Sequence, residues 1–146
     1  MNATPAGGPD DGLEPVPDPA KRAAAHRLIE RVYGLIQRAG FVVMATEDAA
    51  GVEFSYTVGM TEHGLPELVV SSQTRPDGGH MLLELGKRQR RAGAFTPGGV
   101  TVFEGDVWRF DERPTLLSMA LVEIIYGDNL PIEPTALTLT RVPGGA

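Results

Sequence analysis

The densest group of side chains that could do chemistry lies between residues 54 and 68. Hydroxyl, imidazole and carboxylate groups are contributed there by Ser55, Tyr56, Thr57, Thr61, Glu62, His63 and Glu67. A histidine titrates near neutral pH, and a nearby carboxylate can orient the imidazole for proton transfer. These residue types are consistent with acid–base catalysis of a hydrolase or lyase type, in which Glu62 or Glu67 orients His63, and His63 with Glu67 is the pair we expect. The nucleophile would be Thr57, or else Ser55 or Thr61.

The same stretch supports two further interpretations. In a structural one, Gly59 and Gly64 allow backbone conformations that other residues resist, while His63 and Glu67 bond to buried backbone groups. In a recognition one, the loop from residue 57 to 67 forms the rim of a site for a protein partner or a small ligand. The side chains expected to contact that ligand are Tyr56, Thr57, Thr61, Glu62, His63 and Glu67. The sequence leaves the catalytic, structural and recognition interpretations open. Because it has no Gly-x-Ser-x-Gly nucleophile motif, it favours binding without turnover.

Few residues could bind a metal or a cofactor. The chain has no cysteine, which excludes thiol nucleophiles, iron–sulfur clusters and cysteine-ligated zinc. Its histidines are His26, His63 and His80. A metal site built from His63, Glu67 and His80 would lack the helical spacing of His-Glu-x-x-His, because Pro66 interrupts a helix. No glycine-rich nucleotide motif follows a predicted strand. We therefore expect no metal and no cofactor.

Charge divides the chain into an acidic start and a nearly neutral remainder. The net charge is −6, which disfavours non-specific binding to nucleic acid. Two groups of basic residues could meet an anion, although exposed arginines on a helix face are the commoner state. They are Arg27, Arg31 and Arg38, and Lys87, Arg88, Arg90 and Arg91. Small size and acidity also suggest a third class of function, an inhibitor of the phage or immunity kind that acts by protein–protein interaction.

The acidic start and the remainder differ in composition as well. Residues 1–17 are rich in proline and glycine and have almost no large apolar side chains, so burial cannot offset the entropy lost on ordering. We expect a disordered acidic tail there and a single α+β domain over residues 18–146. No apolar run is long enough to cross a bilayer, and no export signal is found. The protein is therefore expected in the cytoplasm, without a membrane partner.

Hydrophobic periodicity predicts the elements of this domain. Apolar residues at three- and four-residue steps predict a helix over 19–39 and a second one over 77–92, which Gly86 weakens. Alternating apolar and polar residues predict strands over 41–46, 52–58, 67–72, 100–103, 107–110 and 136–141, the last at a sheet edge. Hairpins interrupted by single helices indicate an α+β fold. It should contain one mixed or mainly antiparallel sheet of about five to six strands, packed with three helices.

The third helix is expected over residues 114–126. It is apolar on nearly every side, so either the core or a second subunit has to cover it all round. This pattern suggests a homodimer formed through that helix. Trp108 is the only tryptophan and is expected to be buried in the core.

Two neighbouring phrases carry a resemblance to a known family. Tyr56-Thr57-Val58-Gly59-Met60-Thr61 and the following His63-Gly64-Leu65-Pro66-Glu67-Leu68 resemble the signature of a bacterial family, domain of unknown function 4262. The similarity extends from the first helix to Ala136-Leu137, and it implies no known reaction. Members of the family continue the last strand into a Trp-Pro-Asp segment, whereas here Leu139 is followed by Thr140-Arg141-Val142-Pro143. If that segment completes a pocket in relatives, this protein has lost the wall or takes it from a partner.

Overall fold

The computed structural model of the chain describes residues 19–48, 50–113 and 134–143, together with Met119, Val122, Ile125 and Tyr126. The chain divides into two compact units, Met1–Arg31 and Val32–Ala146, and the boundary falls within the first helix. The described part of the first unit consists of helical residues 19–31. The sheet and the second helix belong to the second unit.

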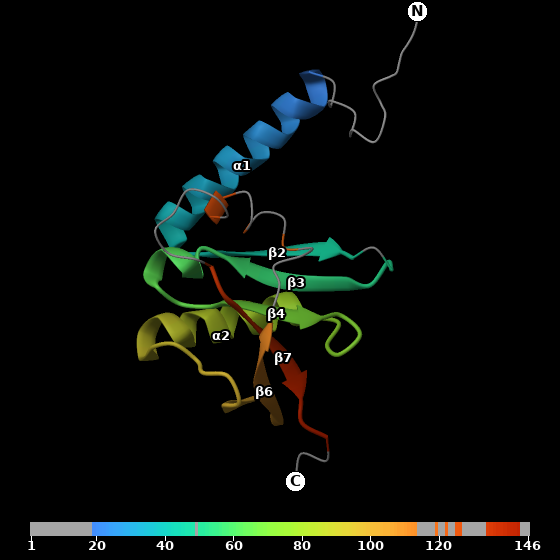
Figure 1. Cartoon of the computed structure of the whole chain (residues 1–146), viewed down its shortest axis with the longest axis vertical. Helices are drawn as coiled ribbons and strands as arrows, with labels where there is room; N and C mark the ends of the chain where they lie inside the picture. Colours follow the sequence, from blue (N-terminus) through green and yellow to red (C-terminus); the bar gives the residue numbers. More distant parts are fainter. Residues whose placement is uncertain are drawn as a thin grey trace, which may run out of the picture. The chain divides into compact units, whose positions relative to one another are not determined.

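Six strands of the second unit form one mixed sheet, in the order β2-β3-β4-β7-β6-β5 (Figure 1). The strands are β2 (Val42–Glu47), β3 (Glu53–Val58), β4 (Glu67–Ser71), β5 (Val100–Phe103), β6 (Asp106–Arg113) and β7 (Ala136–Arg141). β4 and β7 are parallel, and every other neighbouring pair is antiparallel. The expected α+β fold with a single mixed sheet is therefore confirmed.

Helices precede and interrupt the sheet. Helix α1 (Pro19–Ala39) leads into β2, η2 (Met60–His63) is a short 3₁₀ helix between β3 and β4, and α2 (Gly78–Ala92) follows β4. Helix α2 packs against β2, β3 and β4 (Figure 1). The core between helix and sheet is built from large apolar side chains, which are Leu68, Val70, Met81, Leu82, Leu85, Phe103, Trp108, Phe110, Leu137 and Leu139. Burial of this apolar surface is the main force that holds α2 on the sheet.

The number of helices differs from the expectation. The described residues contain two α-helices and the short η2, not three α-helices. Of the helix expected over 114–126, only Met119, Val122, Ile125 and Tyr126 are described, so this helix and the dimer through it lie outside the described residues. The expected tail, residues 1–17, also lies outside them, and the single domain over 18–146 stays a prediction. No helix in the described ranges is long and apolar enough to cross a membrane.

β7 lies inside the sheet, so its expected place at an edge is wrong. Its residue Ala136 is aligned with Glu67 of β4 on one side and with Arg113 of β6 on the other. Alternation of apolar and polar residues reports that one face of a strand is buried. It does not report how many neighbours the strand has, because pairing with β4 and β6 joins segments far apart in the sequence.

Candidate functional site

Glu67, the first residue of β4, has no exposed surface. Both of its carboxylate oxygens accept hydrogen bonds from the 57–67 loop. Oε1 accepts from Thr57 Oγ1 at 2.7 Å and from the Met60 amide at 3.2 Å. Oε2 accepts from the Gly59 amide at 3.2 Å, and from Thr61 through its amide at 3.0 Å and its hydroxyl at 2.7 Å. Five donors of the protein itself therefore surround this carboxylate.

The local sequence explains the arrangement. Antiparallel pairing of β3 with β4 brings Thr57 beside Glu67, and Thr57 Oγ1 also accepts a hydrogen bond from the Leu68 amide at 2.8 Å. Gly59 then turns the chain into η2 with a φ of 123°, which residues with a Cβ resist. The first amides of a helix have no partners within it, and they carry partial positive charge. The carboxylate of Glu67 accepts from these amides and so fixes the start of η2.

Burial raises the pKa of Glu67, because removing a carboxylate from water disfavours its charged form. The hydrogen bonds from Thr61, Thr57 and the Met60 amide lower the pKa, but burial is the larger effect. Both oxygens of Glu67 are engaged by the loop. The arrangement can therefore hold the loop in shape, but it does not present Glu67 to His63 or to a substrate.

His63 bonds to the junction between α1 and β2 rather than to Glu67. Its Nε2 lies 3.0 Å from Gly40 O and donates to it, since a carbonyl oxygen only accepts. The Gly40 amide in turn donates to Ile36 O at 2.7 Å. From α2, Arg90 Nη1 donates to Ala39 O at 3.4 Å. Two side chains therefore bond to carbonyls at the end of α1, where the helix dipole favours such donors.

The 57–67 loop also approaches this junction through its backbone. A Cβ at Gly59 would lie 2.8 Å from both Gly40 O and Phe41 Cα, closer than real Cβ atoms come to other atoms. Only glycine lets the loop come this near. Phe41 is buried, and its ring lies on α2, where a Cβ at Gly86 would be 2.5 Å from Phe41 Cζ. Loop, junction and helix are therefore packed together around Phe41.

Most of the side chains expected to contact a ligand are buried. Four of the six have exposed fractions of 3% or less, and they are Tyr56, Thr57, Thr61 and Glu67. Glu62 and His63 are exposed, and Glu62 Oε2 accepts a hydrogen bond from Tyr126 Oη at 2.6 Å. Burial raises the pKa of Tyr126, and the bond to Glu62 raises it further. The hydroxyls of Thr57 and Thr61 both donate to Glu67, while Glu62 accepts from Tyr126 and His63 donates to Gly40 O.

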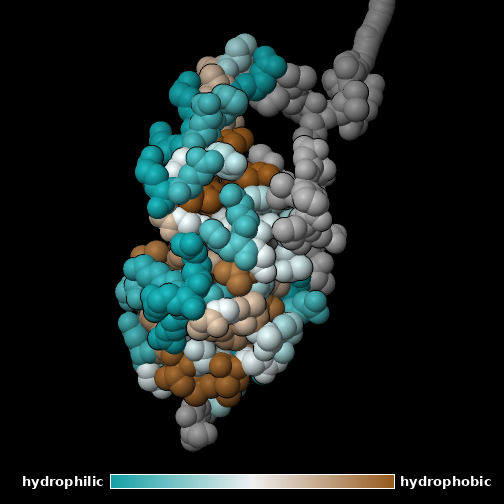
Figure 2. Space-filling model, turned by 90° about the vertical axis from the view of Figure 1, so that its left-hand side faces the viewer, coloured by the Kyte–Doolittle hydropathy of each residue, from teal (hydrophilic) through white to brown (hydrophobic). Residues whose placement is uncertain are grey.

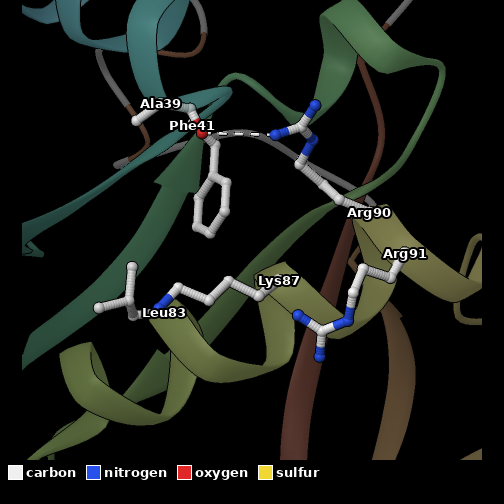
Figure 3. Close-up of a pocket in the computed structure, with 6 residues that line it drawn as sticks. All are labelled: Ala39, Phe41, Leu83, Lys87, Arg90 and Arg91. Atoms are coloured by element: carbon white, nitrogen blue, oxygen red, sulfur yellow. Dashed lines mark hydrogen bonds between the residues drawn. The ribbon is translucent and has the colours of Figure 1, made fainter.

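A cavity of about 360 Å³ opens beside the junction between α1 and β2 (Figure 3). Its lining combines apolar and basic side chains, which are Ala39, Phe41, Leu83, Lys87, Arg90 and Arg91. Figure 3 shows the ring of Phe41 pointing toward α2, the helix that contributes Leu83 and the basic residues. Positions 83, 87, 90 and 91 recur at helical steps, so they share one face of α2.

The cavity is basic and partly open to solvent. Its lining contains no Asp or Glu among the described residues. Leu83 is 40% exposed, and Lys87, Arg90 and Arg91 are exposed as well. Figure 2 shows the side of the molecule that α2 occupies, with hydrophobic residues lying between hydrophilic ones. The lining can therefore contact an apolar group and a negatively charged group at the same time.

The two histidines outside the loop lie beside exposed carboxylates. His80 Nε2 is 3.6 Å from Glu104 Oε2, and His26 Nε2 is 3.7 Å from Glu30 Oε2. Within the ranges that the structure describes, no group of three or more histidine, aspartate or glutamate side chains is placed to hold a metal ion.

The sequence alone does not connect Phe41 with the basic residues of α2. Arg90 belongs to the basic run 87–91, which could meet an anion, but no local pattern places that run beside the end of α1. Two signals were present in the sequence. Leu83, Lys87 and Arg90 have the spacing of one helix face, and a glycine inside a helix, Gly86, can mark a close approach by another element. That Phe41 lies against this face of α2 depends on long-range packing, which the local sequence does not show.

The family model described as Domain of unknown function (DUF4262) matches residues 35–124, which is more than half of the chain. The chain therefore belongs to this family, as its resemblance led us to expect. The matched range includes the 57–67 loop, the junction between α1 and β2, and all of α2. No curated protein and no solved structure matches the chain.

Proposed function

We propose that this DUF4262 protein is a binding module that holds a small ligand in the cavity beside Phe41 and Leu83, without catalytic turnover. The observation that supports this proposal is the cavity itself, with its volume of about 360 Å³ and its apolar and basic lining. Cavities of about 300 to 1,000 Å³ with a mainly apolar lining and a few polar groups are typical of small-molecule sites. In this proposal the 57–67 loop holds Phe41 in position. His63 bonds to Gly40 O, and Gly59 packs closely against Gly40 and Phe41.

The contacts of Glu67 favour binding over acid–base catalysis. A histidine that moves protons needs an oriented ring within reach of a bound substrate, commonly through a paired carboxylate. Here Glu67 accepts from the loop, His63 donates to Gly40 O, and Thr57 is buried with its hydroxyl donating to Glu67. An enzyme that uses His63 with Glu67 stays a prediction that these contacts do not favour. An inhibitor that acts by protein–protein interaction stays a prediction as well.

Amide chemical shifts of the ¹⁵N-labelled full chain test the proposal. The probe is a mixture of small aromatic and aliphatic alcohols, carboxylic acids and amines. We expect saturable shifts to be largest at Phe41, Leu83 and Lys87, because these residues line the cavity. The substitution Leu83→Trp should abolish the shifts by filling the cavity. Leu35→Trp is the matched control, since Leu35 is a similarly exposed leucine outside the lining.

Two results would reject this function. The first is a set of saturable shifts centred on residues 55–62 that persists in Leu83→Trp, which would move binding to the loop. The second is the absence of saturable shifts with every class of compound in the mixture. Loss of binding in Leu35→Trp to the same extent as in Leu83→Trp would also count against the cavity.

A further inference from the structure

We propose further that the cavity selects a small organic anion with an apolar body, such as an aryl or alkyl carboxylate. This inference rests on the proposed function, because it names the class of ligand that the same cavity takes. One face of α2 presents both features that such a ligand needs. Lys87, Arg90 and Arg91 supply positive charge, and Leu83 supplies apolar surface next to them.

The positive charge of the lining is not balanced by a carboxylate among the described residues that line it. Outside the lining, Glu84 Oε2 lies 3.5 Å from Lys87 Nζ. Their side chains are 42% and 49% exposed, and ion pairs with such exposure contribute little. Lys87 therefore keeps most of its attraction for another anion. A negatively charged group in the cavity would meet an excess of positive charge.

The carbonyl ends of two helices reduce this charge without cancelling it. Each helix end carries roughly half a negative charge, and both α1 and α2 end beside the cavity. Arg90 offsets the negative end of α1, since its Nη1 donates to Ala39 O. At the end of α2, the Gly93 amide donates to Gln89 O. Lys87 and Arg91 then supply the charge that binds the anionic group of a ligand.

The apolar part of the lining makes a bare inorganic anion a poor fit. Leu83 is exposed beside the cations, and an apolar ligand body that covers it would remove apolar surface from water. The Phe41 ring is held in place by its close packing on Gly86. A wall that is already ordered loses little entropy when a ligand binds. A ligand with both an anionic head and an apolar body therefore gains from both parts of the lining.

Isothermal titration calorimetry of the full chain with three matched probes tests this selection. Phenylbutyrate has the head and the body, phenylbutanol has the same body without charge, and acetate has the head alone. We expect phenylbutyrate to bind about two- to fivefold more tightly than phenylbutanol, because Lys87 and Arg91 are exposed and pairs with exposed cations are weak. Acetate should bind more weakly than phenylbutyrate.

Variants locate the charge that makes the selection. The double variant Lys87→Gln/Arg91→Gln should bind phenylbutyrate no more tightly than phenylbutanol. The control Arg22→Gln/Arg27→Gln removes the same charge from exposed residues of α1 outside the lining, and it should keep the preference. High salt should weaken phenylbutyrate binding and leave phenylbutanol binding unchanged, because salt screens exposed charges.

The possible results separate the two proposals. Equal affinity of the wild type for phenylbutyrate and phenylbutanol would overturn the selection for an anion while leaving the cavity as a binding site. A preference that survives in Lys87→Gln/Arg91→Gln would overturn it too, because the anion would then bind elsewhere. If acetate binds as tightly as phenylbutyrate, the apolar body adds no affinity, and the proposed preference for a ligand with such a body is overturned. Failure of all three probes to bind would overturn the selection for an anion, whereas the binding function falls only if the mixture of alcohols, carboxylic acids and amines also gives no saturable amide shifts.

Discussion

The Glu67 carboxylate accepts five hydrogen bonds from residues 57–61, and the residue is completely buried. A carboxylate without partners would be costly to bury, and bonds from amides and hydroxyls offset part of that cost. The loop depends on Glu67 in return, because a buried donor that loses its acceptor costs about 1 to 3 kcal/mol. At the scale of single residues, the reactive groups of this loop stabilise one another.

The pH dependence of unfolding should reveal Glu67. Because burial raises its pKa in the folded protein, the folded chain binds this proton more tightly than the unfolded chain does. The stability that the bound proton adds is present in full below the unfolded pKa and is lost as the pH rises through the folded pKa. We expect the free energy of unfolding of the wild type to fall relative to that of Glu67→Gln as the pH rises above 4.5, the ordinary pKa of a glutamate, until the folded protein has released the proton as well. The fall should be about 1.4 kcal/mol for each unit between the two pKa values.

Urea unfolding followed by tryptophan fluorescence can measure this difference, since Trp108 is the single tryptophan and is buried. Glu53→Gln is the matched control, because it removes the same carboxylate from an exposed position on β3. A wild-type stability that rises relative to Glu67→Gln over this pH interval would contradict the account. It would mean that the five hydrogen bonds outweigh burial.

At the scale of elements, periodicity located helices and strands well but not their neighbours. Helix α1 ends at Ala39, where the apolar spacing predicts, and β5 and β6 form the expected hairpin. The place of β7 between β4 and β6 is not predicted by its own sequence, because that sequence does not encode which strands pair with it. Helix propensity alone marks Gly86 as a weak point of α2. Its role depends on Phe41, which packs against it from outside the helix.

The substitution Gly86→Ala tests how α2 and the junction are packed. Its Cβ would lie 2.5 Å from Phe41 Cζ and 2.9 Å from Met60 Cε, so the buried ring has to move. Overpacking of this kind costs about 1 to 3 kcal/mol, which over most of that range exceeds the gain of up to about 1 kcal/mol from replacing glycine in a helix. We expect a net loss of stability in thermal or urea unfolding, together with altered amide shifts at residues lining the cavity.

Gly79→Ala is the control for this prediction. Gly79 also lies in α2, but a Cβ there would be 3.8 Å from its nearest neighbour, Val43 Cγ1, which is an ordinary contact. This variant should be as stable as the wild type or more stable, by up to about 1 kcal/mol. If Gly86→Ala is stabilised to the same extent as Gly79→Ala, the close packing of Phe41 on α2 is refuted.

At the scale of the second unit as a whole, the loop and the cavity meet at Phe41. The loop packs against its backbone, and its side chain lines the cavity. The loop could be found from the sequence, because its reactive residues are contiguous. The structural interpretation, in which His63 and Glu67 bond to backbone groups, agrees with the contacts observed. The cavity could not be found in this way. Its lining comes from residues 39–41 and 83–91, which only the packing of α2 beside the end of α1 brings together.

Hydrogen exchange of individual amides in the native protein tests most directly whether the loop is turned inward. The amides of Gly59, Met60 and Thr61 donate to a buried carboxylate, so they should exchange as slowly as the Leu68 amide in β4. The Ala50 amide is the reference for a turn, because its bond to Asp48 Oδ1 is exposed. Exchange of all three loop amides as fast as that of Ala50 would contradict the account, since the loop would then open on its own and offer its polar groups to a ligand.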